Sequence, residues 1–206
     1  MNYCIPNLAV AHDALTSPNC SAILTEILEC ALVTIEPRIH AELFGLGVRW
    51  RGVIGEDFFG ALRLEAIVAA DDGKFEFAKY DMSGRPAARA FLFGCYDRLS
   101  DLADIAAWQP EADTIRLLQG SVAMLGEHLI DIPRVAPLQV FSSPLQWLRA
   151  DRAGVYIIDP RRAAAMLEFH TVAAADEPAG RALRAQLAPF TRRLPKILIP
   201  AEKSGD

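Results

Sequence analysis

Two aspartates, Asp159 and Asp176, stand where an active-site acid would stand in an α/β protein. Each follows a short apolar run that predicts a strand, and each precedes a predicted helix with a proline one or two residues on. Ligands bind at the carboxyl ends of strands in open parallel sheets. These two carboxylates and Glu177 could therefore hold Mg²⁺ for a reaction on a phosphoester.

The same placement suits two helix N-caps, because an aspartate side chain accepts hydrogen bonds from the free N–H groups of a first turn. Capping needs no third residue, whereas catalysis does. We therefore interpret Asp159 and Asp176 as caps and keep the metal site as the alternative. No cofactor is expected on the cap interpretation, and Mg²⁺ on the alternative.

A set of arginines in the last quarter of the chain could bind an anion, since guanidinium groups favour phosphates and carboxylates. They are Arg149, Arg152, Arg161, Arg162, Arg181, Arg184, Arg192 and Arg193. Residues 149–206 carry a net charge of +3 and the preceding residues −8. On one side of a sheet, these arginines would form a basic surface for nucleic acid or a protein partner. Alternatively they pair with Asp151, Glu168 and Glu177 and only solvate their helices.

Residues 155–187 resemble a degenerate copy of the Toprim fold of primases and topoisomerases. In that family a strand ends in Asp-x-Asp-x-Ala-Gly before a helix, and Glu177, Ala179 and Gly180 match the later part of this pattern. Asp159 and Pro160 stand where the family has Glu-Gly. Ala175 replaces the first metal-binding aspartate, so the resemblance implies a copy that has lost the Mg²⁺ chemistry. The stretch PLQWLRADRAGVYIID also resembles uncharacterised proteins of bacterial prophages and plasmids.

Other catalytic constellations are incomplete. The chain has no Walker loop, no Gly-x-Gly-x-x-Gly and no Gly-x-Ser-x-Gly. Ser121 reads as a helix cap. Two acidic groups have helical spacing and are interpreted as solvated helix faces: Glu127, His128 and Asp131, and Asp97, Asp101 and Asp104.

The cysteines indicate a reducing compartment. Cys4, Cys20, Cys30 and Cys95 form no CxxC pair, which is typical of reduced thiols in the cytoplasm. No apolar run approaches the roughly 18 residues of a membrane span. The N-terminus has no positively charged segment of the kind that begins a signal peptide. We expect a cytoplasmic protein that does not bind a membrane.

The N-terminal half is predicted to combine a helix pair with a hairpin sheet. Apolar residues recur at helical spacing from Ile23 to Ile35, and Pro37 begins a second helix that stops at Gly45 or Gly47. Alternation predicts strands in 48–54, 61–70 and 75–81, with an Asp-Gly turn joining the last two and a further strand at 88–96. A short helix is expected somewhere in 97–113, a strand at 114–120 and a helix at 121–130.

The C-terminal half is predicted to be a small parallel βαβαβ unit. Ser142 or Ser143 caps a helix with Pro144 in its first turn, and Gly154 ends it. Strands at 155–159, 171–176 and 196–200 alternate with helices at 160–169 and 177–190. The fold class is α/β, or α+β overall. We expect halves at 1–110 and 111–206, with one continuous domain as the alternative.

Three classes of function remain. The first is an intracellular, non-enzymatic adaptor whose basic face contacts nucleic acid or a protein partner. The prophage and plasmid resemblance implies that it comes from a mobile genetic element. The second is a small metal-dependent enzyme that acts on phosphoesters. The third is an assembly component that oligomerises through the Ile23–Ile35 helix. Because no catalytic constellation is complete, we favour the first.

Overall fold

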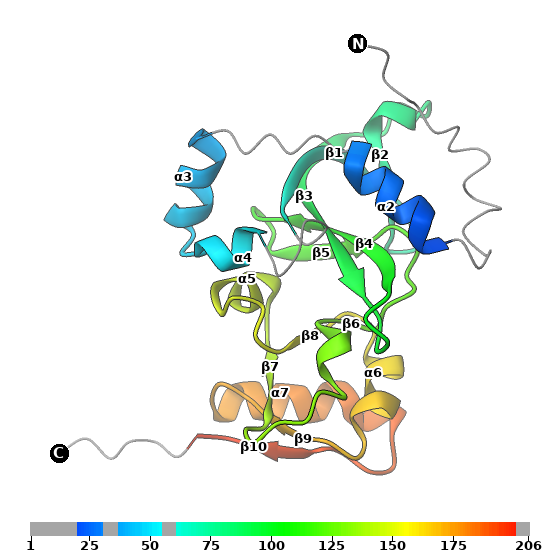
Figure 1. Ribbon diagram of the computed structural model, residues 1–206. Coiled ribbons are helices and arrows are strands. Elements are labelled where there is room, and N and C mark those ends of the chain that lie inside the picture. Colours follow the sequence, from blue (N-terminus) through cyan, green and yellow to red (C-terminus); the bar gives the residue numbers. More distant parts are fainter. Residues whose placement is uncertain (1–19, 31–36, 55–60, 201–206) are drawn as a thin grey trace.

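The computed structural model describes residues 20–30, 37–54 and 61–200, which form two five-stranded sheets with helices packed on them (Figure 1). The fold class is the predicted combination of an antiparallel N-terminal sheet and a C-terminal unit with parallel strands. The helices are α2 (Cys20–Cys30), α3 (Pro37–Gly45), α4 (Trp50–Ile54), α5 (Pro144–Arg149), α6 (Pro160–Leu167) and α7 (Glu177–Leu187).

The first sheet is antiparallel, with strand order β2-β1-β3-β4-β5. Its strands are β1 (Arg63–Ala69), β2 (Phe75–Phe77), β3 (Ala87–Tyr96), β4 (Leu102–Gln109) and β5 (Thr114–Leu117). The predicted hairpin is the β1–β2 pair, and the further predicted strand, β3, joins this hairpin by pairing with β1. β3 and β4 are apolar almost throughout because helices cover both faces of the sheet at its centre.

Helix α2 covers one face of this sheet. Its residues Leu24, Ile27 and Leu28 are buried against a cluster that includes Leu92 of β3 and Ile105 of β4. This confirms the amphipathic pattern that predicted the helix. The predicted continuation of the helix to Glu36 lies outside the described residues.

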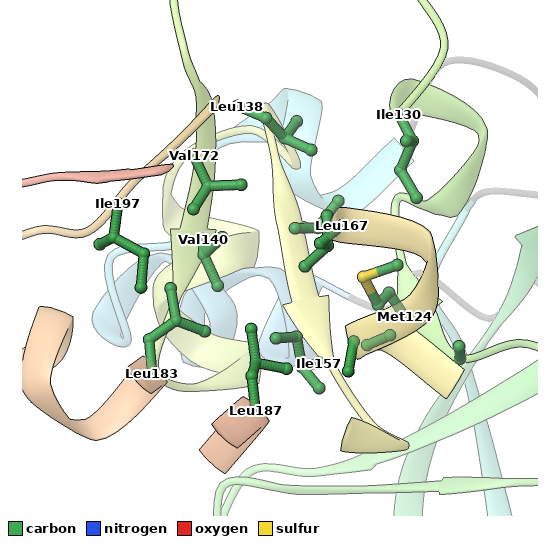
Figure 2. Close-up of a cluster of buried hydrophobic side chains, with 14 of the residues drawn as sticks. Met124, Ile130, Leu138, Val140, Ile157, Leu167, Val172, Leu183, Leu187 and Ile197 are labelled. Carbon is green, nitrogen blue, oxygen red and sulfur yellow. The ribbon is translucent and has the colours of Figure 1, made fainter. Parts of the chain in front are cut away.

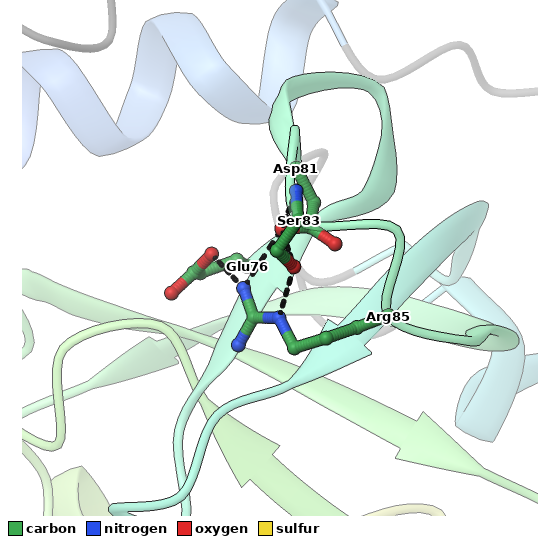
Figure 3. A network of polar contacts seen from close by, with 4 residues as sticks. All are labelled: Glu76, Asp81, Ser83 and Arg85. Carbon is green, nitrogen blue, oxygen red and sulfur yellow. Dashed lines mark hydrogen bonds and ion pairs between the residues drawn. The ribbon is translucent and has the colours of Figure 1, made fainter.

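The connection from β2 to β3 is held by Arg85 (Figure 3). Its guanidinium donates to Glu76 at 2.5 Å, to Asp81 at 3.0 Å and to the Ser83 hydroxyl at 2.9 Å. Ser83 donates to Asp81 from both its hydroxyl and its backbone N–H. The hydrogen bonds from Ser83 and then Arg85 lower the pKa of Asp81 to about 2. The turn therefore keeps its charge pairing throughout the neutral range.

The second sheet has strand order β10-β9-β7-β8-β6, with all its pairs parallel except β6–β8. Its strands are β6 (Met124–Leu125), β7 (Leu138–Phe141), β8 (Val155–Ile157), β9 (Thr171–Ala173) and β10 (Lys196–Leu198). The order reverses after β8, so right-handed crossovers place α5 on one face and α6 and α7 on the other. The predicted strands and helices from β8 to β10 are present. The strand β7, which was not predicted, lies between β8 and β9, and β6 extends one edge of the sheet.

The core of this unit lies between the sheet and helices α6 and α7 (Figure 2). Val140, Val172 and Ile197 supply the strand side, and Leu167 and Leu187 the helix side. Inward-facing residues of each strand alternate with more exposed ones, so each three- or four-residue strand contributes only one or two side chains. The helices supply most of the remaining apolar surface.

Helices α4 and α5 join the two halves. Trp147 and Leu148 of α5 belong to the same buried cluster as Val53 of α4 and Phe93 of β3. Gly52 lies so close to the Leu148 carbonyl oxygen that a Cβ there would overlap it. The first and last parts of the chain therefore share a core across the predicted boundary at residue 110.

Polar groups reinforce this junction. The Arg149 Nε donates to the Leu46 carbonyl at 2.6 Å, and Arg152 donates to the Gly52 carbonyl at 2.7 Å through Nη2. Arg49 forms an ion pair with Asp151 at 2.7 Å.

Several local predictions were wrong. Residues 48–54, expected as a strand, contain the short helix α4. The helix expected at 121–130 is replaced by β6 and the 3₁₀ turn Glu127–Leu129, because Gly126 takes a left-handed conformation with φ +72°. The segment 97–109 forms a turn and the strand β4. Helix α5 ends at Arg149, well before Gly154.

Of the four cysteines, Cys95 is described with its side chain. It is free and buried in β3, as the reduced-thiol prediction requires. Burial, followed by the negative charge of Asp104, raises the pKa of its thiol well above the ordinary value. Cys4 and the side chains of Cys20 and Cys30 lie outside the described residues.

Candidate partner-binding surface

The acids at the strand ends are helix caps. Asp159 accepts hydrogen bonds from two backbone N–H groups of the first turn of α6, at 2.9 and 3.3 Å, and Asp176 from one of α7 at 2.8 Å. Their strands, β8 and β9, are separated by β7. Glu177 pairs with Arg181 at 2.6 Å. Among the described residues, no three His, Cys, Asp or Glu side chains are grouped so that they could hold a metal ion.

Replacing Asp159 with alanine is expected to lower the free energy of unfolding by about 1 kcal/mol, because two N–H groups of α6 lose their acceptor. Asp159→Asn is the matched control and should cost at most a few tenths of this, since asparagine caps as well as aspartate. Urea denaturation of the three proteins measures both effects. An alanine variant as stable as the wild type would rule out the cap.

The structure does not gather the eight arginines on one surface. Arg149 and Arg152 lie on the face of the second sheet that α5 covers. They donate hydrogen bonds to the backbone carbonyls of Leu46 and Gly52. Arg162, on the opposite face, donates to the backbone carbonyls of Gly120 and Ser121. The remaining members of the set are exposed: Arg161, Arg181, Arg184, Arg192 and Arg193.

Asp104 is fully buried in β4, although its spacing suggested a solvated helix face. Its Oδ1 accepts from the backbone N–H groups of Ile105 at 2.8 Å and Gln119 at 3.0 Å. Its Oδ2 accepts from the Ser121 N–H at 2.7 Å and from the Ser121 hydroxyl at 3.0 Å. Burial raises the pKa of Asp104 despite these four bonds. Ser121, predicted as a helix cap, instead anchors the link between the two sheets.

The other predicted acidic faces also have structural roles. Glu127 is buried and accepts from the Ala123 N–H at 2.8 Å. Asp131 forms a two-pronged bond with Arg98, with both distances 2.7 Å, and this bond lowers the pKa of Asp131. Asp97 accepts from two N–H groups of the turn before β4. None of these groups forms a shared catalytic cluster.

The carboxyl edge of the parallel strands contains a small pocket of about 150 Å³. Its lining is mainly apolar, with Ser142, Tyr156 and Gln186 as the larger polar contributors. This is the position where open α/β sheets bind ligands. Its lining includes no charged side chain, and neither Asp159 nor Asp176 reaches it.

The opposite, amino edge of these strands is apolar and exposed. Three connections lead into parallel strands and must lie at this edge: 130–137 before β7, 168–170 before β9 and 188–195 before β10. They carry five exposed large apolar side chains, here called the amino-edge patch: Ile132, Val135, Phe169, Phe190 and Leu194. Phe169 is 75% exposed. Such a concentration on one edge is typical of an interaction surface.

Arginines accompany the amino-edge patch. The Arg193 guanidinium lies over the Phe169 ring, 5.2 Å from its centroid, and Arg192 is exposed beside it. No carboxylate in the described part of the chain pairs with either arginine. The nearby Asp131 is already neutralised by Arg98. The three connections carry Arg134, Arg192 and Arg193 against Asp131 and Glu168, so positive charge predominates around the apolar side chains.

Sequence reasoning found Arg192 and Arg193 but missed the apolar residues beside them. The detectable signal was the presence of large apolar residues in segments predicted as connections. Comparison of the chain with family models, curated proteins and solved structures found no match. Within the described residues, every helix is too short or too polar to cross a membrane.

Proposed function

We propose that this protein is a non-enzymatic adaptor that binds a protein partner through the amino-edge patch. The observation that carries this proposal is the location of Phe169, Phe190 and Leu194 on one edge of the second sheet, together with two arginines that no described carboxylate pairs. Apolar side chains supply the buried centre of such an interface, and the arginines supply its polar rim.

The chemistry of the edge favours a partner segment that is acidic and carries apolar anchors. Arg192 and Arg193 attract carboxylates and can bind them with two parallel hydrogen bonds. A base of single-stranded nucleic acid can stack on an exposed phenylalanine. The isoleucine, valine and leucine of the patch offer it no such contact, and the chain as a whole has a net charge of −5. A protein partner uses both features.

Non-enzymatic action is supported by the roles of the acids that an enzyme would use. Asp159 and Asp176 are taken up by helix caps, and Glu177 by an ion pair with Arg181. Asp104 accepts hydrogen bonds from three backbone N–H groups. The Mg²⁺-dependent alternative would need these side chains to come together before they could share a metal, because β7 separates the strands that precede Asp159 and Asp176.

Site-specific photo-crosslinking in cells tests the proposed function. A photoreactive phenylalanine at Phe169 is expected to capture a defined protein, and the same group at Met82 is the control. Met82 is at least as exposed as Phe169 but lies in the β2–β3 connection of the first sheet. The capture should fall by about tenfold or more in an Arg192→Glu, Arg193→Glu double variant, because each lost charge contact is worth on the order of 1 kcal/mol.

Two outcomes would contradict this function. One is the same set of captured proteins from both positions, undiminished by the charge reversal. The other is salt-dependent binding of a labelled DNA duplex that the double variant loses while no protein is captured. Circular dichroism confirms that each variant is folded.

A further inference from the structure

A second cavity, of about 170 Å³, lies between the two sheets and shares no residue with the amino-edge patch. The carboxyl end of β3, the β3–β4 turn, the segment around Gly126 and the end of α5 enclose it. A cavity of about 150 Å³ holds one benzene ring in a protein core. This cavity is therefore large enough for a molecule built on a single ring.

One wall of the cavity is aromatic and cationic. The rings of Phe93 and Trp147 are stacked with their centroids 5.8 Å apart. The Arg152 guanidinium lies 5.0 Å from the Phe93 centroid and 5.5 Å from the Trp147 centroid. A ligand placed here would meet aromatic ring atoms and positive charge together.

Another part of the lining supplies hydrogen-bonding groups. Tyr96 and His128 line the cavity with their rings edge to face at 5.6 Å, and Ser100 is exposed at the rim. Among the residues that line the cavity, Arg152 and His128 are basic and none is acidic. The charge and the shape together select an anion with an apolar body.

The cavity is not arranged for covalent chemistry. Cys95 is the thiol in its lining, and burial keeps the pKa of that thiol well above the ordinary value. The thiol is therefore protonated at neutral pH and a poor nucleophile. Reversible binding is the function that the lining supports.

We propose that this cavity binds a small carboxylate built on one planar ring, with the carboxylate directed to Arg152 and His128 and the ring against Phe93 and Trp147. A bound ligand would contact both halves of the protein, because Trp147 and Arg152 come from the α5 region and Phe93 from β3. Binding should therefore raise the melting temperature.

Benzoate is a suitable probe, and the three tryptophan indole N–H signals in a ¹H–¹⁵N correlation spectrum provide the readout. Titration is expected to shift the Trp147 signal saturably, with Kd on the order of millimolar for so small a ligand. Trp108, whose indole N–H donates to Asp113 outside the cavity, and the half-exposed Trp50 should not move. Benzyl alcohol, which has the ring without the charge, should bind about tenfold more weakly.

Three variants test the contacts. Arg152→Gln and His128→Gln should each weaken benzoate binding by about tenfold. Arg49→Gln removes the ion pair to Asp151 at the same junction, leaves the lining intact and should not change Kd. If the loss of the Arg152–Gly52 bonds unfolds the first variant, His128→Gln decides the question.

The proposed site is overturned if Trp147 does not respond to benzoate at about 10 mM, the range expected for a ring-sized ligand. It is also overturned if benzyl alcohol binds as tightly as benzoate, or if both cavity variants keep the wild-type Kd.

Discussion

Asp104→Ala is expected to lower the free energy of unfolding by about 4 kcal/mol. The wild-type carboxylate accepts four hydrogen bonds in a site with no solvent exposure, and three of the donors are backbone N–H groups that cannot turn elsewhere. Each buried donor left without an acceptor costs about 1–3 kcal/mol. The exposed Asp101→Ala is the matched control, with an expected change within about 0.5 kcal/mol in the same urea titration.

Asp104→Asn removes the titratable carboxyl group and keeps a side chain of the same size, so it isolates the effect of the charge on stability. Burial raises the pKa of Asp104 above its ordinary value of 3.8, so the folded protein holds this proton to a higher pH than the unfolded chain does. The associated stability is fully present below 3.8 and is lost as pH rises through the raised pKa. The stability of the wild type relative to the asparagine variant should therefore fall with rising pH. A difference that does not change with pH would contradict a raised pKa.

Gly126→Ala is expected to destabilise the protein by about 3 kcal/mol. A Cβ at this position would overlap the carbonyl oxygen of Gly154, which is backbone and cannot rotate away. The same carbonyl accepts the hydrogen bond of the Trp147 indole at 2.9 Å, so any displacement disturbs the junction as well. Overpacking of this kind costs about 1–3 kcal/mol, and a left-handed alanine adds about 1 kcal/mol.

Gly73→Ala is the control for Gly126→Ala. Gly73 has φ +83° in the β1–β2 turn, but a Cβ there would meet no atom within 4 Å. Only the conformational cost of about 1 kcal/mol remains. Thermal and urea denaturation of both variants would give the steric cost as the difference. Equal losses in the two variants would mean that the Gly126–Gly154 contact relaxes freely.

The parts of the fold that were predictable are those with local signals. Each helix of the C-terminal unit begins with a cap and a proline in its first turn, and these signals act within four residues. Asp159 and Asp176 were interpretable as caps for the same reason. The β1–β2 hairpin was marked by its Asp-Gly turn and its alternating strands.

The parts that were missed depend on distant contacts. Asp104 has the spacing of a helix face. Its role as a buried acceptor depends on the N–H groups of Gln119 and Ser121, which follow β5 in the chain. The alternation of residues 48–54 suggested a strand, whereas the contact of Gly52 with α5 favours a helix there. The amino-edge patch could not be predicted from the sequence. The exposure of a loop residue depends on which distant elements cover the loop, and the residues next to it in sequence do not indicate this.

The α4–α5 junction also determines when, during synthesis, the core shared by the two halves can form. Arg49 and Gly52 meet partners about a hundred positions later in the chain. About a hundred further residues must therefore leave the ribosome after α4 before α4 can contact α5. Until then the apolar side of α4 and the adjoining face of the first sheet remain open on the nascent chain. This is the interval in which a chaperone would have most to protect.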